Sequence, residues 1–460
     1  METKSLGLIV VMLIIGLGIG GVAGFYVAPP AGPGGQVTVT VTGPGTTVTV
    51  PGPTVTVTVN PLKNTVIKMG DIMPQTSPDV QLEVPFVSIM ETDLNAYLTA
   101  LGFGASAKIL IDDAQASPSI HLEKVQSFKS QGVNLIMGGG WSSLAQGSLS
   151  YMNENNMLLM SWSSTSPLLR IPNDALFRTC PQDLIQGAAN AEIWKSWGVK
   201  AIIIFHRIDP WGEGLYQVMS TEAPQRGIEI IERVGYAPET TDFASYLAHM
   251  DDLAAAAIAK YGDKKYVGVQ IFSFDEQVTY LSQAESYPNI KDLIWVGTES
   301  GGRSQTYIDQ VGAPLIPKRM FSSLMGAAES SDRWKSLDSR YSAATKQSAS
   351  FYTGSRYDGF WLMVLSALEA GTLDANTIKP IIRNVAYNFY GTTGWVSLDE
   401  NGDRLAQVFD IWGYYRVANT GNNTADFKFR KFGEYDGRII QVKWDDAALA
   451  DVGVTRPALG

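Results

Sequence analysis

The sequence predicts an α/β protein made of two lobes, each with a parallel sheet covered by helices. At 460 residues, the chain exceeds the length at which one hydrophobic core stops growing, so two packed lobes are expected. After Lys63, short apolar runs alternate with longer amphipathic runs, which is typical of βα units. Two sets of such units follow one another in the chain, and each set predicts a sheet of its own.

Composition narrows the classes of partner. Hydrophobic residues make up 45% of the chain and charged residues 17%, as in an ordinary soluble protein, so a membrane function requires a local segment. The formal net charge of −10 and the lack of basic runs with interleaved aromatic residues argue against binding to nucleic acid. Nucleic acid is therefore not expected as a partner.

Cysteine and histidine are scarce in this sequence. Cys180 is the single cysteine, which excludes an intramolecular disulfide and a zinc cluster of cysteines. The histidines, His121, His206 and His249, are far apart, and none has the spacing of metal ligands. The sequence has no GxSxG elbow, phosphate-binding loop or HExxH motif. We therefore expect no enzyme activity, no catalytic or metal-binding residues and no cofactor.

The first element in the chain is an apolar segment. No charged residue occurs from Leu6 to Ala28, and a helix of this length would span about 34 Å, enough for a bilayer core. We predict a cytoplasmic tail over 1–5 and a retained single-pass anchor in the cell membrane over 6–28, with the rest of the chain outside. A cleaved signal peptide is the alternative, but the apolar stretch is long and its cleavage signal is poor.

Three glycines in this segment, Gly16, Gly20 and Gly24, recur at every fourth position. This spacing lets two membrane helices approach closely, so a weak helix–helix dimer is one interpretation. The other interpretation is that glycine is simply tolerated in lipid.

Residues 29–62 combine Val–Thr alternation with proline and glycine. Alternation of this kind is typical of a strand, but the triplets at 43–45 and 51–53 interrupt it, and an isolated strand has no partner for its backbone. We therefore predict an extended stalk that holds a domain roughly 80 Å from the membrane. Its threonines are candidate O-glycan acceptors and Asn422 begins an N-glycosylation sequon, and both agree with an exterior location.

The strands and helices of the two sets follow in order. In the first set, strands are predicted over 66–72, 107–114, 132–140 and 157–162, and helices over 84–102, 119–132 and 144–156. In the second set, a helix ends at Trp197, strands are predicted over 200–206, 228–236, 266–274 and 293–299, and helices over 214–227 and 243–262. Ligands of open parallel sheets bind outside the carboxyl ends of the strands.

The tripeptide Trp-Ser-Ser occurs twice, at 141–143 and at 162–164. Each copy lies where a strand of the first set ends, so both are expected at one edge of one sheet. Ser143 and Gln146 have the spacing of a capping box, which places backbone N–H groups behind Ser142 at the start of a helix. A helix N-terminus with adjacent hydroxyls suits a carboxylate. The alternative is that the serine only caps its helix and the tryptophan only packs.

Several motifs stand in a characteristic order between Ile67 and about Trp444. They are IKMGDIMPQTSP, DLNAYLTALG, GVNLIMGGGWSS, LLMSWSSTSPLL, FRTCPQDLIQGAA, IDPWGEGL, TTDFASYL, SFDE, WVGTES, SRYDGFWLMVLSALEAG and GTTGWVSLDENGDR. Their order and spacing resemble the type I solute-binding proteins of ABC importers, in particular the group that binds branched-chain amino acids (Leu, Ile and Val). The resemblance implies a periplasmic-binding-protein-like type I fold, with two Rossmann-like lobes.

In that fold, three chain crossings join the lobes and form the hinge. The resemblance implies crossings near Cys180, Phe321 and Trp395. The first lobe would then contain residues 63–179 and 322–395, and the second lobe residues 180–321 and 396–445, followed by a C-terminal tail over 446–460.

The resemblance also implies residues of the first lobe that hold an amino acid by its charged groups. Trp141, Ser142 and Ser143 match the carboxylate site, where a backbone N–H and a hydroxyl are the donors. Ser163 and Thr165 match positions that contact both the carboxylate and the ammonium group. Trp141 stands where the family usually has a small residue.

Three positions of the second lobe complete the site that the resemblance implies. Glu299 matches the acidic residue that pairs with the ammonium group, although a surface carboxylate is the other interpretation of this position. Phe274 matches an aromatic residue of this lobe, and Trp211 stands where tyrosine is common. The two tryptophans either narrow the pocket or offer faces to an aromatic or cationic ligand, so no particular amino acid is predicted.

The expected function is that of an extracytoplasmic binding protein that captures an amino acid or a related small polar solute by lobe closure. It would deliver this ligand to the permease and ATPase subunits of an ABC transporter. The alternative is a ligand-sensing ectodomain or a surface recognition module with the same fold, which would rely on a partner for signalling.

Overall fold

The computed structural model describes residues 61–74, 84–405, 408–417 and 424–457, and the strand backbone of residues 47–48 and 57–58. The predicted cytoplasmic tail and anchor, the glycines Gly16, Gly20 and Gly24, and Asn422 lie outside the described residues. Within the described ranges, no helix is both long enough and apolar enough to cross a membrane.

Two short strands pair within the predicted stalk. β1 (Thr47–Val48) and β2 (Val57–Thr58) form an antiparallel ladder, with Thr47 opposite Thr58 and Val48 opposite Val57. These four residues differ from the unpaired chain that the proline and glycine content predicts, because each strand supplies backbone partners for the other.

The first lobe contains a six-stranded sheet in the order β15-β7-β6-β5-β3-β4, and every neighbouring pair is parallel. Its strands are β3 (Val66–Met73), β4 (Ser106–Asp113), β5 (Leu135–Met137), β6 (Leu158–Ser161), β7 (Leu176–Pro181) and β15 (Asp403–Arg404). Its helices are α1 (Val84–Ala100), α2 (Pro118–Ser130), α3 (Ser142–Glu154), α9 (Asp332–Thr345), α10 (Phe351–Ala370) and α11 (Ala375–Tyr387).

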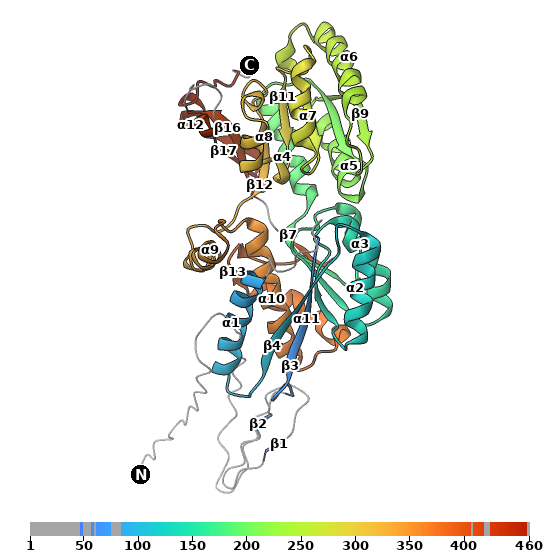
Figure 1. Cartoon of the computed structure of the whole chain (residues 1–460), viewed down its shortest axis with the longest axis vertical. Coiled ribbons are helices and arrows are strands. Elements are labelled where there is room, and N and C mark those ends of the chain that lie inside the picture. Colours follow the sequence, from blue (N-terminus) through green and yellow to red (C-terminus); the bar gives the residue numbers. More distant parts are fainter. Residues whose placement is uncertain are drawn as a thin grey trace, which may run out of the picture.

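Helices cover both faces of this sheet (Figure 1). Along β3, Ile67 and Met69 join the core under α1, α10 and α11, whereas Ile72 joins the core under α2 and α3. Side chains of a strand alternate between its two faces, so a strand that is covered on both sides is apolar throughout. The central strands β5 (LIM) and β6 (LLMS) accordingly consist almost entirely of apolar residues.

The second lobe contains an eight-stranded sheet in the order β18-β17-β16-β12-β11-β10-β8-β9. The strands are β8 (Ala201–Arg207), β9 (Glu229–Tyr236), β10 (Val267–Phe272), β11 (Ile294–Gly297), β12 (Phe321–Met325), β16 (Val408–Arg416), β17 (Phe427–Asp436) and β18 (Gln441–Trp444). The pairs from β9 to β12 are parallel, and the pairs from β12 to β18 are antiparallel. Its helices are α4 (Asp183–Ser196), α5 (Pro210–Gln225), α6 (Ala244–Tyr261), α7 (Gln277–Gln283), α8 (Gln305–Gln310) and α12 (Asp446–Ala450).

Two of the three expected crossings lie later in the chain than predicted. The first crossing lies between β7 and α4, near Cys180 as expected. Phe321 begins β12, a strand of the second lobe, so the chain returns to the first lobe only after Met325. β15 belongs to the first sheet, so the last crossing follows Arg404 rather than Trp395. The predicted boundaries differ because β12 and β15 form through pairing with distant strands.

The predicted C-terminal tail is part of the second lobe as far as the structure describes it. α12 lies within residues 446–460, and its residues Ala448 and Leu449 are each 1% exposed in the core of that lobe. The sequence also did not predict the antiparallel strands β16 to β18 or the helices α9 to α11. β13 (Tyr390–Gly391) and β14 (Gly394–Trp395) form a small hairpin after α11.

Candidate functional site

The two Trp-Ser-Ser segments lie at the carboxyl ends of β5 and β6, which are neighbours in the sheet. Ser161 Oγ donates to Gly139 O at 2.8 Å. The partly exposed Ser163 donates from its Oγ to Gly140 O at 2.5 Å. Gly139 has a φ of 58°, and a Cβ atom there would lie 2.8 Å from Ala145 Cβ, so this turn requires glycine. The prediction that both copies share one sheet edge is confirmed.

Helix α3 begins earlier than the capping-box spacing predicts. Trp141 is the N-cap residue and its side chain makes no capping hydrogen bond, because an indole ring offers no acceptor. Ser142 is the first helical residue, and the partly exposed Ser143 is the second. The prediction that Ser143 caps the helix was therefore wrong. The N-terminus of α3 lies beside the serine segments without a side-chain cap.

Two predicted contact residues use their hydroxyl groups inside the protein. Ser142 is 2% exposed, and its Oγ accepts hydrogen bonds from Ser166 N at 3.2 Å and from Ser164 Oγ at 3.3 Å. Thr165 is fully buried, and its Oγ1 donates to Asp183 Oδ2 at 2.9 Å. Their hydroxyls therefore hold the loop and orient a carboxylate.

Aromatic side chains of the two lobes contact one another. The ring centroid of Phe274 lies 5.3 Å from that of Trp141 in the first lobe and 4.6 Å from that of Trp211, on which it stacks. The guanidinium carbon of Arg207 lies 4.2 Å from the Phe274 centroid. Trp211 is buried, whereas Trp141 and Phe274 are partly exposed. Three of the predicted residues are thus brought together across the lobes.

Asp183 and Glu299 form an acidic pair in the second lobe, which also carries Trp211 and Phe274. Gln186 Nε2 donates to Glu299 Oε2 at 2.7 Å. Tyr352 of α10, in the first lobe, is close enough to lower the pKa of the Glu299 carboxyl. Asp183 lies in the first turn of α4, is fully buried, and accepts no hydrogen bond at Oδ1 from the described residues. Within the described part of the chain, neither carboxylate has an ion-pair partner.

The two carboxyl groups influence each other's protonation. Burial raises the pKa of Asp183 well above its ordinary value, and the charge of Glu299 raises it further. Burial also raises the pKa of Glu299, although the hydrogen bond from Gln186 and the nearby Tyr352 hydroxyl oppose this effect. Because two close carboxylates repel each other, a cation between them would stabilise both in their ionised form.

The sequence analysis missed Asp183, Gln186 and Tyr352. Asp183 and Gln186 stand in FRTCPQDLIQG, the motif that begins a helix directly after a strand, and a pair of polar groups at such a point was the available signal. Tyr352 had no comparable signal, because its approach to Glu299 depends on how the two lobes meet.

The described part of the chain holds other titratable groups outside this pair. Among the described residues, no cluster of three or more His, Cys, Asp or Glu side chains is arranged to hold a metal ion. Burial raises the pKa of the Cys180 thiol, which keeps this group protonated. Burial and the charge of Arg233 lower the pKa of His206 to about 4, and its ring nitrogens bond Arg207 O and Arg233 Nε, each at 2.8 Å.

Comparison with known proteins identifies similar chains. The model of the family described as "Receptor family ligand binding region" matches residues 93–416. An uncharacterized protein of Methanocaldococcus jannaschii is 24% identical over 403 residues, which cover 83% of this chain and 92% of the relative.

Solved structures share the fold. The leucine binding protein LivK from Thermotoga maritima matches with a TM-score of 0.67 and 16% identity, over 81% of this chain and 99% of that chain. A solute binding protein of an ABC transporter from Rhodopseudomonas palustris, in complex with 3,4-dihydroxybenzoic acid, matches with a TM-score of 0.63 and 16% identity, over 81% and 98% of the two chains. The predicted type I periplasmic-binding-protein fold is confirmed.

Proposed function

The chain belongs to the family of receptor ligand binding regions, and we propose that it is an extracytoplasmic binding protein for an amino acid or a related small polar solute. In this proposal the ligand lies between the lobes, against the ends of β5 and β6. Asp183 and Glu299 hold its cationic group, and the N-terminus of α3 holds its carboxylate.

The observation that carries this proposal is the acidic pair. Asp183 is fully buried, its Oδ1 accepts no hydrogen bond from the residues that the structure describes, and it faces the charge of a second carboxylate, that of Glu299. An ionised carboxylate in such a place costs free energy unless a cation compensates it. An ammonium group with three donors fits two carboxylates that approach from different elements.

The opposite end of the ligand would meet donors. The N-terminus of α3 has no side-chain cap, and its backbone N–H groups carry the positive end of the helix dipole. Ser143 is partly exposed beside it and is the hydroxyl candidate for the ligand carboxylate, whereas the Ser163 hydroxyl donates its proton to Gly140 O. Ser142 and Thr165 support the site indirectly, through the loop at 164–166 and through Asp183.

The aromatic cluster of Trp141, Trp211 and Phe274 favours a ligand with an apolar or aromatic portion. Proteins of this fold differ in what they bind: one is a leucine binding protein, and another was solved with an aromatic acid. An amino acid with an aromatic or branched side chain would place its ammonium group against the acidic pair and its side chain against the aromatic cluster.

The proposal is tested by titration calorimetry on residues 63–460 with a panel of amino acids, urea and short amides. We expect saturable binding of at least one amino acid with an apolar side chain. For that amino acid, the amine without the carboxylate and the acid without the ammonium group should each bind at least about tenfold more weakly, because each lacks one charged contact. Binding by none of these compounds would refute the proposal.

We further propose that residues 6–28 anchor the protein in the membrane and that ABC permease and ATPase subunits receive the ligand. The uncharged segment of sufficient length supports the anchor. The fold shared with a solute binding protein of an ABC transporter supports the transporter subunits as partners. After expression of the full chain, the protein should remain in the membrane fraction until detergent is added, and a chain that lacks residues 6–28 should not. Release of the full chain by carbonate alone would contradict the anchor.

A further inference from the structure

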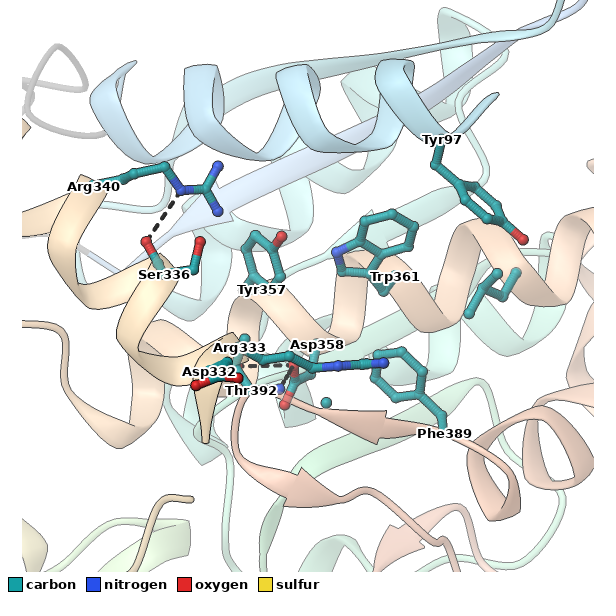
Figure 2. A pocket seen from close by; sticks show the side chains of 12 residues that line it. Tyr97, Asp332, Arg333, Ser336, Arg340, Tyr357, Asp358, Trp361, Phe389 and Thr392 are labelled. Atoms are coloured by element: carbon teal, nitrogen blue, oxygen red, sulfur yellow. Dashed lines mark hydrogen bonds between the residues drawn. The ribbon is translucent and has the colours of Figure 1, made fainter. Parts of the chain in front are cut away.

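A cavity of about 290 Å³ lies in the first lobe and shares none of its lining residues with the predicted site between the lobes. Its walls come from α1, α9, α10 and the β13–β14 hairpin with the residues beside it. Its volume is close to the lower end of the range of small-molecule pockets. Figure 2 shows the side chains that line it.

One wall of the cavity is aromatic. The Trp361 ring lies with its centroid 5.4 Å from that of Tyr97 in an edge-on arrangement and 6.4 Å from that of Tyr357. Phe389 and Leu365 add apolar surface. Tyr97 and Trp361 are only partly buried, so part of this wall is open to a ligand from solvent. Such a wall favours a flat apolar or aromatic group.

Two guanidinium groups line the same cavity, but they differ in their partners. Arg340 forms a bidentate ion pair with Asp93, with both N–O distances at 2.8 Å. Arg333 donates from Nη1 to Tyr390 O and takes part in none of the ion pairs among the described residues. Figure 2 shows the Arg333 side chain extending toward Phe389. Arg333 therefore brings an uncompensated positive charge to the apolar wall.

The acidic groups of the lining do not neutralise Arg333. The Asp358 carboxylate is fully buried and accepts four hydrogen bonds from the backbone N–H and hydroxyl groups of Thr392 and Thr393, at 2.6 to 3.0 Å. Asp332 is exposed in the first turn of α9, where water and the helix dipole stabilise its charge. Neither carboxylate forms an ion pair with Arg333.

We propose that this cavity is a second small-molecule site, which takes a small aromatic carboxylate. The ring would lie against Trp361, Tyr97 and Phe389, and the carboxylate would pair with the Arg333 guanidinium, whose planar fork suits two oxygens. This site is separate from the cleft and does not depend on what the cleft binds.

The test is saturation-transfer NMR and calorimetry on residues 63–460 with benzoate, phenylacetate and indole-3-acetate as probes. We expect at least one probe to bind at one site with a Kd below about 1 mM. Benzamide and benzylamine, which lack the negative charge, should bind at least about tenfold more weakly. Equal binding of benzamide, or no binding of any carboxylate probe, would overturn the proposal.

Variants identify where the probe binds. Arg333→Gln should weaken binding at least about tenfold, and Ser336→Trp, at an exposed position of the rim, should block the cavity without disturbing the core. Arg438→Gln, which changes an exposed arginine of the second lobe, is the matched control and should bind as the parent does. Thermal unfolding of each variant checks that it is folded.

The variant Asp183→Asn distinguishes binding in this cavity from binding between the lobes. The variant should lose affinity for an amino acid in the cleft and should bind the aromatic probe unchanged. If the probe is lost in Asp183→Asn and kept in Arg333→Gln, it binds in the cleft and the second site is refuted. If no amino acid binds but the probe depends on Arg333, the second site stands although the proposed function fails.

Discussion

Asp183 is the first residue of helix α4 in the second lobe. In the sequence it is one of several carboxylates that follow an apolar run. In the structure it is fully buried, Thr165 orients its Oδ2, and its Oδ1 accepts no hydrogen bond from the described residues. A buried carboxylate without a cationic partner is rare in folded proteins, because its desolvation costs free energy. Such a residue is therefore informative about the ligand.

The first prediction concerns the charge of the acidic pair. Asp183→Asn and Glu299→Gln should each weaken amino-acid binding at least about tenfold, because each removes a charge with little change of shape. At a pH above the raised pKa values, each should also stabilise the protein without ligand by about 1 kcal/mol, since the repulsion between the ionised carboxylates is lost. Calorimetry measures the first effect and chemical unfolding the second. Exposed Glu239→Gln is the control, and parent-like affinity in both cleft variants would contradict the role of the pair.

The second prediction concerns pH. The pKa values of Asp183 and Glu299 are raised, so the folded protein without ligand holds their protons above the ordinary values of 3.8 and 4.5. The protons that the folded protein binds at these two groups stabilise it. This stabilisation is complete below the ordinary pKa values and is lost as pH rises through the raised pKa values. An ammonium ligand favours the ionised forms, so its affinity should increase as pH rises over the same range. Calorimetry at several pH values measures this increase, and an equal slope in Asp183→Asn would contradict it.

At the scale of elements, the turn between β5 and α3 shows how the site is supported. Gly139 N donates to Nε2 of His121, which is fully buried on α2, at 2.8 Å. Burial lowers the pKa of His121 to about 4, so the ring is neutral and acts as an acceptor. This bond joins α2 to the glycine turn that precedes Trp141. The predicted strands were confirmed here, but the start of α3 was not, because a tryptophan rather than a serine occupies the N-cap.

The third prediction uses this histidine. The pKa of His121 falls from 6.5 to about 4 on folding. Its contribution to the free energy of unfolding is therefore complete above pH 6.5 and is lost as pH falls through about 4. The total contribution is about 3 kcal/mol. His121→Gln should remove this pH-dependent contribution to stability. The difference in unfolding free energy between parent and variant should therefore shrink on acidification. Urea unfolding at several pH values measures it, and a constant difference would show that His121 does not titrate on unfolding.

At the scale of the whole molecule, Arg404 connects two of the crossings between the lobes. It is 5% exposed at the end of β15, and its Nη1 donates to Thr179 O in β7 at 2.8 Å and to Thr393 Oγ1 at 2.7 Å. Its Nη2 donates to Thr393 O at 3.0 Å and to Trp395 O at 2.9 Å. A single guanidinium thus holds the chain on the first-lobe side of the first and last crossings.

The fourth prediction follows from these bonds. Arg404→Lys keeps the charge but cannot supply the planar fork, so it should lower the free energy of unfolding by about 2 kcal/mol. Exposed Arg438→Lys is the matched control and should change it by less than about 0.5 kcal/mol. Urea unfolding measures both variants. An effect of Arg404→Lys no larger than that of the control would show that these bonds do not stabilise the hinge.

By itself, the sequence determined the α/β class, the parallel strands β3 to β6 and β8 to β11, and the edge where the two Trp-Ser-Ser segments meet. These features depend on local periodicity and on the order of strands along the chain, both of which can be read from the residues. Only the tertiary structure decided the last two crossings, the antiparallel strands of the second lobe and the partners of Asp183. Those features depend on contacts between residues far apart in the chain. Burial and pairing are properties of the assembled lobes. Asp183 of α4 and Glu299, which follows β11, come together only when these elements pack, so the order of residues could not predict the acidic pair.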